Sequence, residues 1–530
     1  MRLKPHALIL ILVAIAMALL APAAGASTNQ VAMFESDAAL YGDPVNTLST
    51  LRSLGVSEVR VSVPWFSTYR NGARAFSKPA GFNGADPRSS QYDFSRLDPI
   101  VRDAPRFGIT VDLSLTGGAP IWATGRGEPG GRRDTEWRPS ASEYGKFVQA
   151  VGTRYDGRFR PSAGAAALPR VRVWEVWNEP NFGPDLAPQS TNKSSVSTSP
   201  GMYRGLVDAA WSALGRTGHG RDTVILGNLD ARGMRARPTK HNPEGYPGTF
   251  APTKPIAFIR SLYCLDGRLR PIRGKTASAM GCPTTAAGSR RFRRDHPGLF
   301  QAAGFADHPY PDTTPPNRTD SSDRDFAELI QIPHMAHVLD ETQHAYGSGH
   351  RFSVYDNEFG YITNPPNRSQ HFPSPTQAAV WINWAEYISY NDPRLASTMQ
   401  FLLEDPIPTQ TLEFGGFASG LLFSGAKPKP SYDAYRLPVY MPQTRVRRNR
   451  SVLVWGCARP AHAYNQHRVL IQYRAGRHGA FATIASLSVR NVRGYFETHV
   501  RLRSSGALRL AWGYPGGATV YSRSVNVTVR

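Results

Sequence analysis

The sequence predicts an α/β protein: a (β/α)8 TIM barrel followed by a small antiparallel β-sandwich domain. Two observations carry this prediction. From Ser27 to about Tyr440, short apolar segments alternate with amphipathic stretches, as in parallel strands joined by helices. From 441 to 530 the pattern changes to short alternating segments separated by Gly, Pro and Asn turns, which is typical of an antiparallel sandwich.

Eight segments are predicted to be the barrel strands, because each is short, apolar and followed by a polar turn. They are 30–34, 58–63, 109–115, 171–177, 223–229, 305–310, 351–358 and 398–403. The stretches predicted to be helical are 45–54, 97–107, 141–154, 202–214, 324–346 and 377–390, with a last helix over 427–435. The Pro-, Gly- and Arg-rich segment at about 231–300 breaks this rhythm and is predicted to be an insertion.

The C-terminal segment 441–530 is strongly basic. It has fifteen arginines, no lysine and one carboxylate, Glu497, so its net charge is +14 of the chain's +22. Such a domain suits an anionic partner, for example a cell-wall polymer or an acidic polysaccharide, and an arginine-rich background composition is the alternative. Nucleic acid is the weaker hypothesis, because the chain carries no recognisable reader motif. Six sandwich strands are expected, at 451–455, 468–473, 482–489, 495–502, 507–512 and 520–529.

Residues 1–26 are predicted to be a secretory signal peptide. Arg2 and Lys4 form a basic start, 7–21 is an apolar run, and Ala24-Gly25-Ala26 offers a cleavage site before Ser27. The run is shorter than the roughly 18 residues that a membrane span needs, and no later segment is apolar enough to span a bilayer. The mature chain is therefore expected to be secreted, without a transmembrane segment.

The chain has three cysteines, Cys264, Cys282 and Cys457. In an exported protein the first two are expected to pair. Cys457 lies in the strand-like VLVWGCA and is expected to be a buried small hydrophobe. No closely spaced Cys/His pair repeats, so a metal site is not predicted.

Two strands end in a lone carboxylate. The stretch Val171–Phe182, VRVWEVWNEPNF, places Glu179 after strand four, and VYDNEFGY places Glu358 after strand seven. In a barrel the C-terminal strand ends form the active site, and strands four and seven face each other. Two carboxyl groups placed in this way can lie roughly 5–5.5 Å apart.

Further polar and aromatic residues are expected on the same face as substrate-binding residues: Arg60, Trp65, Trp122, Asn178, His308 and Tyr310. Glu404 and Asp405 after strand eight could bind substrate or cap a loop. Trp65, Trp122 and Trp177 could offer flat faces to sugar rings.

These motifs resemble those of clan A glycoside hydrolases over about residues 30–440. Asn178-Glu179-Pro180 is similar to the clan's acid/base motif, and DNEFGY around Glu358 to its nucleophile motif. Arg60 matches the strand-two arginine, and His308-Pro-Tyr310 resembles the strand-six pair. The GAPIW turn at 118–122 is closer to family 39 than to family 5.

The sequence also departs from the family pattern. Family 5 members usually carry a histidine after strand three, where this chain has Ser114 and Thr116. The strand-eight tryptophan common in the clan is replaced by Phe401 and Leu402. The sequence therefore does not identify the residue that forms the floor of the sugar subsite next to the scissile bond.

The resemblance implies a secreted retaining glycosidase without a cofactor, cleaving O-glycosidic bonds of a polysaccharide or oligosaccharide through a covalent glycosyl-enzyme. Glu179 would be the acid/base and Glu358 the nucleophile. Asn178 would bind a sugar 2-hydroxyl, while Arg60 and Tyr310 would keep Glu358 ionised. The alternatives are a transglycosylase with the same residues and a non-catalytic carbohydrate- or wall-binding barrel, which the two glutamates disfavour.

Overall fold

The computed structural model describes residues 29–70, 72, 75–129, 134–191, 196–242, 245–319, 323–369, 371–407, 416–459, 467–514 and 517–530. The predicted signal peptide at 1–26 lies outside these residues. Within the described part, no helix has both the length and the apolar character needed to cross a membrane.

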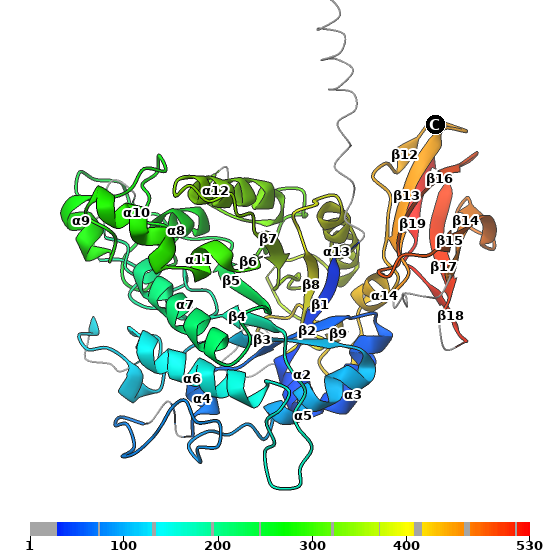
Figure 1. The fold of residues 1–530 in the computed structure, drawn as a ribbon. Helices are drawn as coiled ribbons and strands as arrows, with labels where there is room; N and C mark the ends of the chain where they lie inside the picture. Colours follow the sequence, from blue (N-terminus) through cyan, green and yellow to red (C-terminus); the bar gives the residue numbers. More distant parts are fainter. Residues whose placement is uncertain are drawn as a thin grey trace, which may run out of the picture.

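Eight parallel strands form one nearly closed barrel, which confirms the predicted fold (Figure 1). They are ordered β7-β6-β5-β4-β3-β2-β1-β8. A parallel bridge between Val354 and Leu395 brings the two ends of the sheet together. The strands are β1 (Val31–Glu35), β2 (Glu58–Ser62), β3 (Thr110–Leu115), β4 (Val173–Val176), β5 (Thr223–Asp230), β6 (Gly304–His308), β7 (Ser353–Asp356) and β8 (Ser397–Phe401).

Helices surround the barrel (Figure 1). They are α2 (Asp37–Gly42), α3 (Pro44–Ser53), α4 (Trp65–Thr68), α5 (Leu97–Asp103), α6 (Ala141–Arg154), α7 (Ser199–Arg216), α8 (Pro255–Leu262), α9 (Gly274–Ala279), α10 (Ala286–Asp295), α11 (Gly298–Gln301), α12 (Ile332–His344), α13 (Pro375–Tyr390) and α14 (Pro430–Arg436). In the described part of the chain, short 3-10 turns are η2 (Ala104–Phe107), η3 (Ile121–Ala123) and η5 (Leu329–Gln331).

The helix predicted over 324–346 begins later than expected. Its α-helical part, α12, starts at Ile332, and Pro333 occupies its first turn. A proline is favoured there because the first helical amides have no partner inside the helix. The proline therefore marks the start of the helix, where the prediction placed it in the interior.

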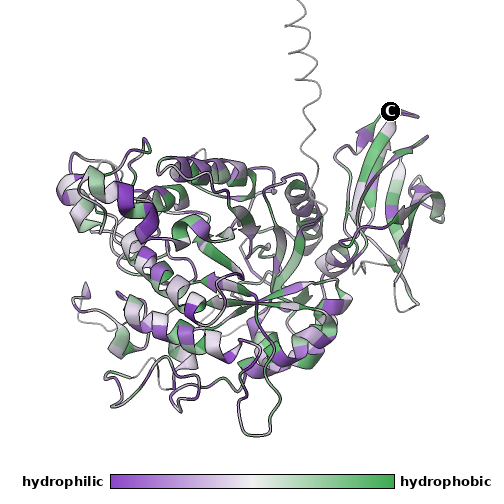
Figure 2. Ribbon diagram, in the orientation of Figure 1, coloured by the Kyte–Doolittle hydropathy of each residue, from purple (hydrophilic) through white to green (hydrophobic). Residues whose placement is uncertain are grey.

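The barrel core is built from apolar strand residues and the inner faces of the helices. Figure 2 shows hydrophobic strands in the middle and hydrophilic positions on the outer helix surfaces. Trp174 on β4 is 0% exposed and contacts the ring of His219 behind the strand. The apolar runs that predicted the strands are therefore explained by burial, because both faces of a parallel sheet are covered.

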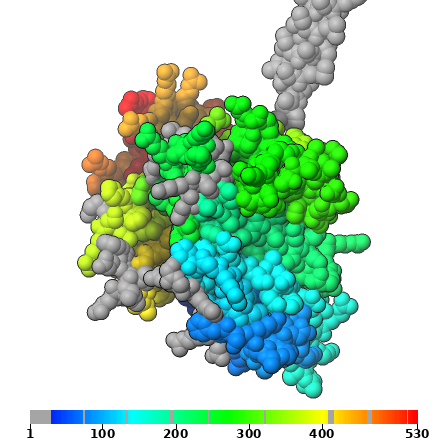
Figure 3. Space-filling model, turned by 90° about the vertical axis from the view of Figure 1, so that its left-hand side faces the viewer, coloured from blue at the N-terminus to red at the C-terminus, as the bar shows by residue number. Residues whose placement is uncertain are grey.

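The predicted insertion at about 231–300 contains four helices, α8 to α11. Helix α8 packs against α7 and α12, so it belongs to the helical layer of the barrel. The rest forms part of an outer face, coloured green in Figure 3, with the C-terminal domain beyond it in orange and red. A disulfide joins Cys264 to Cys282, as predicted, and Cys457 is buried as a free thiol.

The C-terminal domain is a two-sheet sandwich whose strands pair antiparallel, apart from the short parallel pair of β12 with β19. Its strands are β11 (Val439–Tyr440), β12 (Arg445–Val446), β13 (Ser451–Cys457), β14 (His467–Ala475), β15 (Ala482–Val489), β16 (Tyr495–Arg501), β17 (Gly506–Gly513), β18 (Thr519–Tyr521) and β19 (Val525–Val529), and a separate hairpin, β9 (Leu422–Phe423) with β10 (Lys427–Pro428), precedes it. One sheet is β11-β13-β16, and the other is β12-β19-β17-β14-β15 with β18 beside β17. The strand predicted over 520–529 is wrong in one respect, since it is divided into β18 and β19.

The sandwich is anchored to the barrel by a buried ion pair. Arg459 donates to both carboxylate oxygens of Glu386 on α13, at 2.8 and 2.9 Å, and both side chains are almost inaccessible to solvent. The hydroxyl of Tyr495 donates to the same carboxylate. Gly55, with φ of 87°, allows the close approach, because a Cβ there would lie 2.3 Å from Cβ of Arg459.

Removing one charge of this pair is expected to destabilise the fold. In Glu386→Gln the shape is kept but Arg459 stays buried without its counter-charge, which costs about 3–5 kcal/mol of unfolding free energy. Urea unfolding measures the loss. Arg294→Gln, which breaks an exposed pair with Asp295, is the matched control and should change stability by about 0.5 kcal/mol or less. Equal effects of the two variants would contradict the anchoring role.

Candidate active site

Glu179 and Glu358 lie just beyond β4 and β7, at the C-terminal end of the barrel. After β4 the chain turns sharply, since Trp177 and Glu179 have positive φ angles of 67° and 34°. The amide of Glu179 donates to the carbonyl of Asn228, which lies at a bulge in β5. This turn directs the carboxyl group of Glu179 across the barrel mouth.

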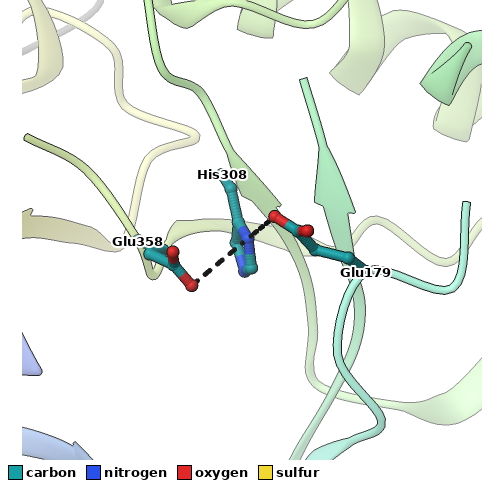
Figure 4. Close-up of side chains that lie close together, drawn as sticks. All are labelled: Glu179, His308 and Glu358. Atoms are coloured by element: carbon teal, nitrogen blue, oxygen red, sulfur yellow. Dashed lines mark hydrogen bonds and ion pairs between the residues drawn. The ribbon is translucent and has the colours of Figure 1, made fainter. Parts of the chain in front are cut away.

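The two glutamates are bridged by His308 at the end of β6 (Figure 4). Its Nδ1 lies 2.8 Å from Oε1 of Glu179 and 3.4 Å from Oε2 of Glu358. One oxygen of each carboxyl group and this nitrogen lie within 4.8 Å of one another. The structure therefore brings together the three residues that the sequence placed on strands four, six and seven.

Glu358 accepts hydrogen bonds from two further predicted residues. The hydroxyl of Tyr310 donates to Oε1 at 2.9 Å, and Nη1 of Arg60 lies 3.3 Å from Oε2. A phenol and a guanidinium both favour the ionised form of a carboxylate. Glu179 accepts only from His308 among the described side chains.

Arg60 is the centre of a buried charge network that the sequence did not reveal. Its side chain is 1% exposed and donates to Glu175 at 2.7 Å and to Glu35 at 2.5 Å. Its Nη2 donates to Oδ1 of Asn178 at 2.8 Å. Arg60 thus orients Glu358 and Asn178, and its burial leaves little surface for the direct substrate contact that was predicted.

Amide side chains extend this network. Asn357, next to the nucleophile candidate, donates to Glu175 and to Asn228, both at 2.8 Å. Asn228 in turn donates to the carbonyl of Trp177 at 2.7 Å. The segments that follow β4 and β7 are therefore fixed to strands β4 and β5 by side chains.

Burial raises the pKa of both candidate catalytic groups. For Glu179 it raises the pKa to about 7, with the charge of Arg60 opposing this and that of Glu35 adding to it. Burial also raises the pKa of Glu358 to about 7, while His308 and Arg60 act against it. Since Glu358 has more hydrogen-bond donors, we expect that Glu179 holds the proton when the pair carries one, and that Glu358 then carries the charge.

His308 is neutral at neutral pH, because burial lowers its pKa despite the charge of Glu358. Its Nε2 has no hydrogen-bond partner among the described residues. An unpaired acceptor is less costly than an unpaired donor, so the proton belongs on Nδ1, where it can be donated to Glu179 and Glu358.

Two further carboxyl groups surround Glu179. Burial raises the pKa of Asp230 to about 8 and that of Asp185 well above its usual range, and Glu179 adds to both effects when it is ionised. Asp185 also contacts Nδ2 of Asn178 at 3.4 Å. Nothing in the sequence pattern singled out these two residues.

The tryptophans divide into buried and accessible ones. Trp65 is 1% exposed and stacks on Phe147, and Trp177 is 0% exposed and donates its indole N–H to the carbonyl of Asp185. Neither has a free face, so the predicted sugar-stacking role does not fit them. Trp122 is partly exposed in an aromatic cluster with Trp65. Between described residues, no hydrogen bond or ring contact joins Trp65 or Trp122 to either glutamate.

An aromatic surface replaces the missing strand-eight tryptophan. Phe417 is 36% exposed and its ring lies 5.3 Å from that of Phe401 and 5.1 Å from that of Tyr310. Because Tyr310 bonds Glu358, this surface adjoins the nucleophile candidate. Phe417 comes from the segment after β8, so strand-end inspection could not find it.

Glu404 and Asp405 hold the loop after β8 together. Glu404 accepts from the amide of Gly425 at 2.7 Å, and Asp405 accepts from the amide of Gly420 and from Nζ of Lys429. Both carboxylates therefore accept hydrogen bonds from the chain that follows β8, which favours the loop-capping alternative.

Glu179, His308 and Glu358 are also spaced as three ligands of a metal ion would be. The guanidinium of Arg60 lies 3.3 Å from the Glu358 carboxylate, however, and a second cation there would be repelled. The donor set fits proton sharing between two carboxyl groups better than it fits cation binding.

A bell-shaped pH dependence is expected from this pair. The active form has one proton, on Glu179, so kcat/KM should be highest near neutral pH and fall when the pair gains a second proton or loses the first. Rates measured with an aryl glycoside of good leaving ability test this. In Glu179→Gln the alkaline limb should vanish, and its persistence would assign that limb to another group.

Stability should also depend on these two groups. Their pKa values are raised in the folded state, so between the unfolded value near 4.5 and the folded value of about 7 the folded state binds more protons. The stabilising contribution is complete below the lower value and is lost as pH rises through about 7. The free energy of unfolding, measured with urea, should therefore fall less in Glu358→Gln than in the parent protein between pH 5 and pH 8.

No protein-family model matches this chain, and no curated protein matches it. A β-D-mannosidase from Dictyoglomus thermophilum aligns with 9% identity and a TM-score of 0.37, covering 93% of this chain and 50% of that one. A β-galactosidase from the psychrophilic Marinomonas ef1 aligns with 14% identity and a TM-score of 0.31, covering 76% and 58%. A superoxide reductase from Ignicoccus hospitalis aligns over 18% of this chain and 79% of its own, with 11% identity and a TM-score of 0.16. TM-scores this low support no conclusion on function.

Proposed function

We propose that the protein is a glycoside hydrolase, and specifically a retaining one that cleaves O-glycosidic bonds of a polysaccharide or oligosaccharide. The observation that carries the proposal is the pair Glu179 and Glu358, whose nearest oxygens are within 4.8 Å across the barrel mouth. Such close spacing fits direct attack by one carboxylate. An inverting enzyme leaves room for a water molecule, with carboxyl groups roughly 6.5–9.5 Å apart.

In the first step, Glu179 donates its proton to the leaving oxygen as the glycosidic bond breaks. The Glu358 carboxylate attacks the anomeric carbon and forms the covalent glycosyl-enzyme. In the second step, ionised Glu179 takes a proton from water, the water oxygen attacks the anomeric carbon, and Glu358 leaves. Configuration is retained because two inversions occur.

The neighbouring side chains support these roles. The Tyr310 hydroxyl and the Arg60 guanidinium stabilise the charge that Glu358 carries before it attacks and again as it is released. Asn178, oriented by Arg60, can donate to a sugar 2-hydroxyl. Phe417, which is 36% exposed and lies beside Tyr310, takes the sugar-stacking role that the sequence assigned to tryptophans.

The test is the configuration of the first product. A panel of aryl glycosides identifies a substrate, and proton NMR then follows the anomeric signal at early times. Retention of the substrate's configuration is the expected result. An inverted first product would exclude the double displacement, and a fully inert purified chain would favour the non-catalytic alternative.

We also propose that the protein is exported, on the basis of the signal-like residues 1–26. N-terminal sequencing of the chain recovered outside the expressing cells should begin at Ser27. Recovery only inside the cells, with Met1 retained, would exclude this.

A further inference from the structure

The sandwich carries a hollow on the outer face of its six-stranded sheet. This hollow has a volume of about 560 Å³ and is lined by His467, Arg468, Leu470, Thr483, Ala511, Trp512, Gly513 and Thr519. These residues come from strands β14, β15, β17 and β18. In Figure 1, β14 and β15 lie toward the side of the sandwich away from the barrel.

The hollow arises from small side chains on the central strand β17. In the sheet register Ala511 pairs with Leu470 on β14 and with Tyr521 on β18, and Gly513 pairs with Thr519. The neighbouring strands β14 and β18 carry larger side chains, so the surface is hollowed over β17. A Cβ at Gly513 would meet no heavy atom within 4 Å.

One arginine, Arg468, lines the hollow, and a second, Arg509 on β17, lies beyond it. Arg468 is exposed, and its Nε donates to the hydroxyl of Ser486. Next to the hollow, Arg509 lies between two aromatic rings, 3.9 Å from that of Tyr521 and 4.1 Å from that of Phe481. Its Nε donates to Gln472, which leaves both terminal nitrogens without a hydrogen-bond partner among the described residues.

The charge of this face is of one sign only. The six strands of this sheet contain no Asp or Glu, and the single carboxylate of 441–530, Glu497, lies on β16 in the other sheet. The planar guanidinium of Arg509 lies against aromatic rings, and its parallel N–H donors match the two oxygens of a carboxylate. The hydroxyls of Thr483 and Thr519 beside it suit a ligand rich in hydroxyl groups.

We propose that the outer face of this sheet binds an acidic polysaccharide, with a carboxylate-bearing sugar in the hollow against Arg468 and the chain continuing over Arg509. The ring faces of Tyr521 and Phe481 are covered by Arg509, so they do not offer the stacking platforms that single-stranded nucleic acid uses. The site is separate from the glutamate pair and does not depend on the proposed hydrolysis.

The experiment measures binding of the full-length mature chain to polygalacturonate, with a neutral glucan of similar length as the comparison. Arg468→Gln with Arg509→Gln should weaken binding by at least about tenfold. Gly513→Phe fills the hollow and keeps every charge, so it should also weaken binding several-fold. Thermal unfolding of each variant shows whether the fold is kept.

The matched control is Arg450→Gln with Arg501→Gln, which removes the same charge from exposed positions at the edge of the other sheet. This variant should bind within about twofold of the parent chain. An equal loss in the control would overturn the proposal in favour of unspecific charge attraction. Equally tight binding of the neutral glucan, of duplex DNA or of anionic vesicles would also overturn it, as would full binding by Gly513→Phe.

Discussion

Replacing Glu358 by glycine is expected to abolish hydrolysis while leaving a protein that azide reactivates. The substitution removes the carboxylate that attacks the anomeric carbon, and the loss in kcat should be on the order of 10⁴- to 10⁶-fold. It also leaves a space beside the Tyr310 hydroxyl and the Arg60 guanidinium, which lie 2.9 and 3.3 Å from the missing oxygens. A small anion such as azide fits that space and replaces the missing negative charge.

The configuration of the azide product distinguishes the two glutamates. In Glu358→Gly, azide attacks in place of the nucleophile and Glu179 still donates its proton, so the glycosyl azide should have the inverted configuration. In Glu179→Ala, azide attacks the glycosyl-enzyme after Glu358 has reacted, so the configuration should be retained. Glu341→Gln, at an exposed carboxylate of α12, is the control and should keep full activity.

The assignment of roles would be refuted if azide restored activity in neither variant, or if the glycosyl azide had the same configuration in both. Wild-type rates in Glu358→Gly and Glu179→Ala would refute the site itself. Either result would leave the barrel fold untouched, because neither side chain belongs to the apolar core.

The candidate pair could be found from the sequence because each glutamate follows a strand in a conspicuous polar turn. Strand ends are readable from the pattern, and a barrel brings all of them to one face. His308 and Tyr310 were accessible for the same reason, and the structure places both against the pair.

Glu35 and Glu175 were missed because their importance depends on register. Glu35 lies directly opposite Arg60 in the pairing of β1 with β2, and Glu175 lies opposite Ser114 in the pairing of β3 with β4. A pattern of apolar residues gives the strands but not the offset between them. A signal did exist, since Glu175 is a carboxylate inside the otherwise apolar run VWEV.

The aromatic predictions failed for a different reason. A tryptophan after a strand can point into the core or over the site, and the sequence pattern is the same in both cases. Trp65 and Trp177 fill the core, while Phe417, far from any predicted strand, has the exposed face. Side-chain direction in irregular segments depends on tertiary packing, which short-range patterns do not encode.

Replacing Arg60 by methionine should be among the most destabilising changes in the barrel. Arg60 is 1% exposed and contacts Glu35, Glu175 and Glu358. Its removal leaves three carboxylates close together without their shared cation, and breaking such a buried network costs about 3–5 kcal/mol of unfolding free energy. Arg70→Met, at an exposed arginine 3.9 Å from Asp93, is the control and should cost at most about 1 kcal/mol.

A double variant separates the electrostatic effect from simple loss of packing. Glu175→Gln in the Arg60→Met background removes one of the orphaned charges, so it should restore part of the lost stability. The pH dependence gives a second, independent measure. Because Arg60 lowers the pKa of Glu358, its loss should move the acidic limb of kcat/KM to higher pH in whatever fraction folds. If the limb stays in place and Glu175→Gln restores nothing, Arg60 acts through packing alone and the charge network does not tune the nucleophile.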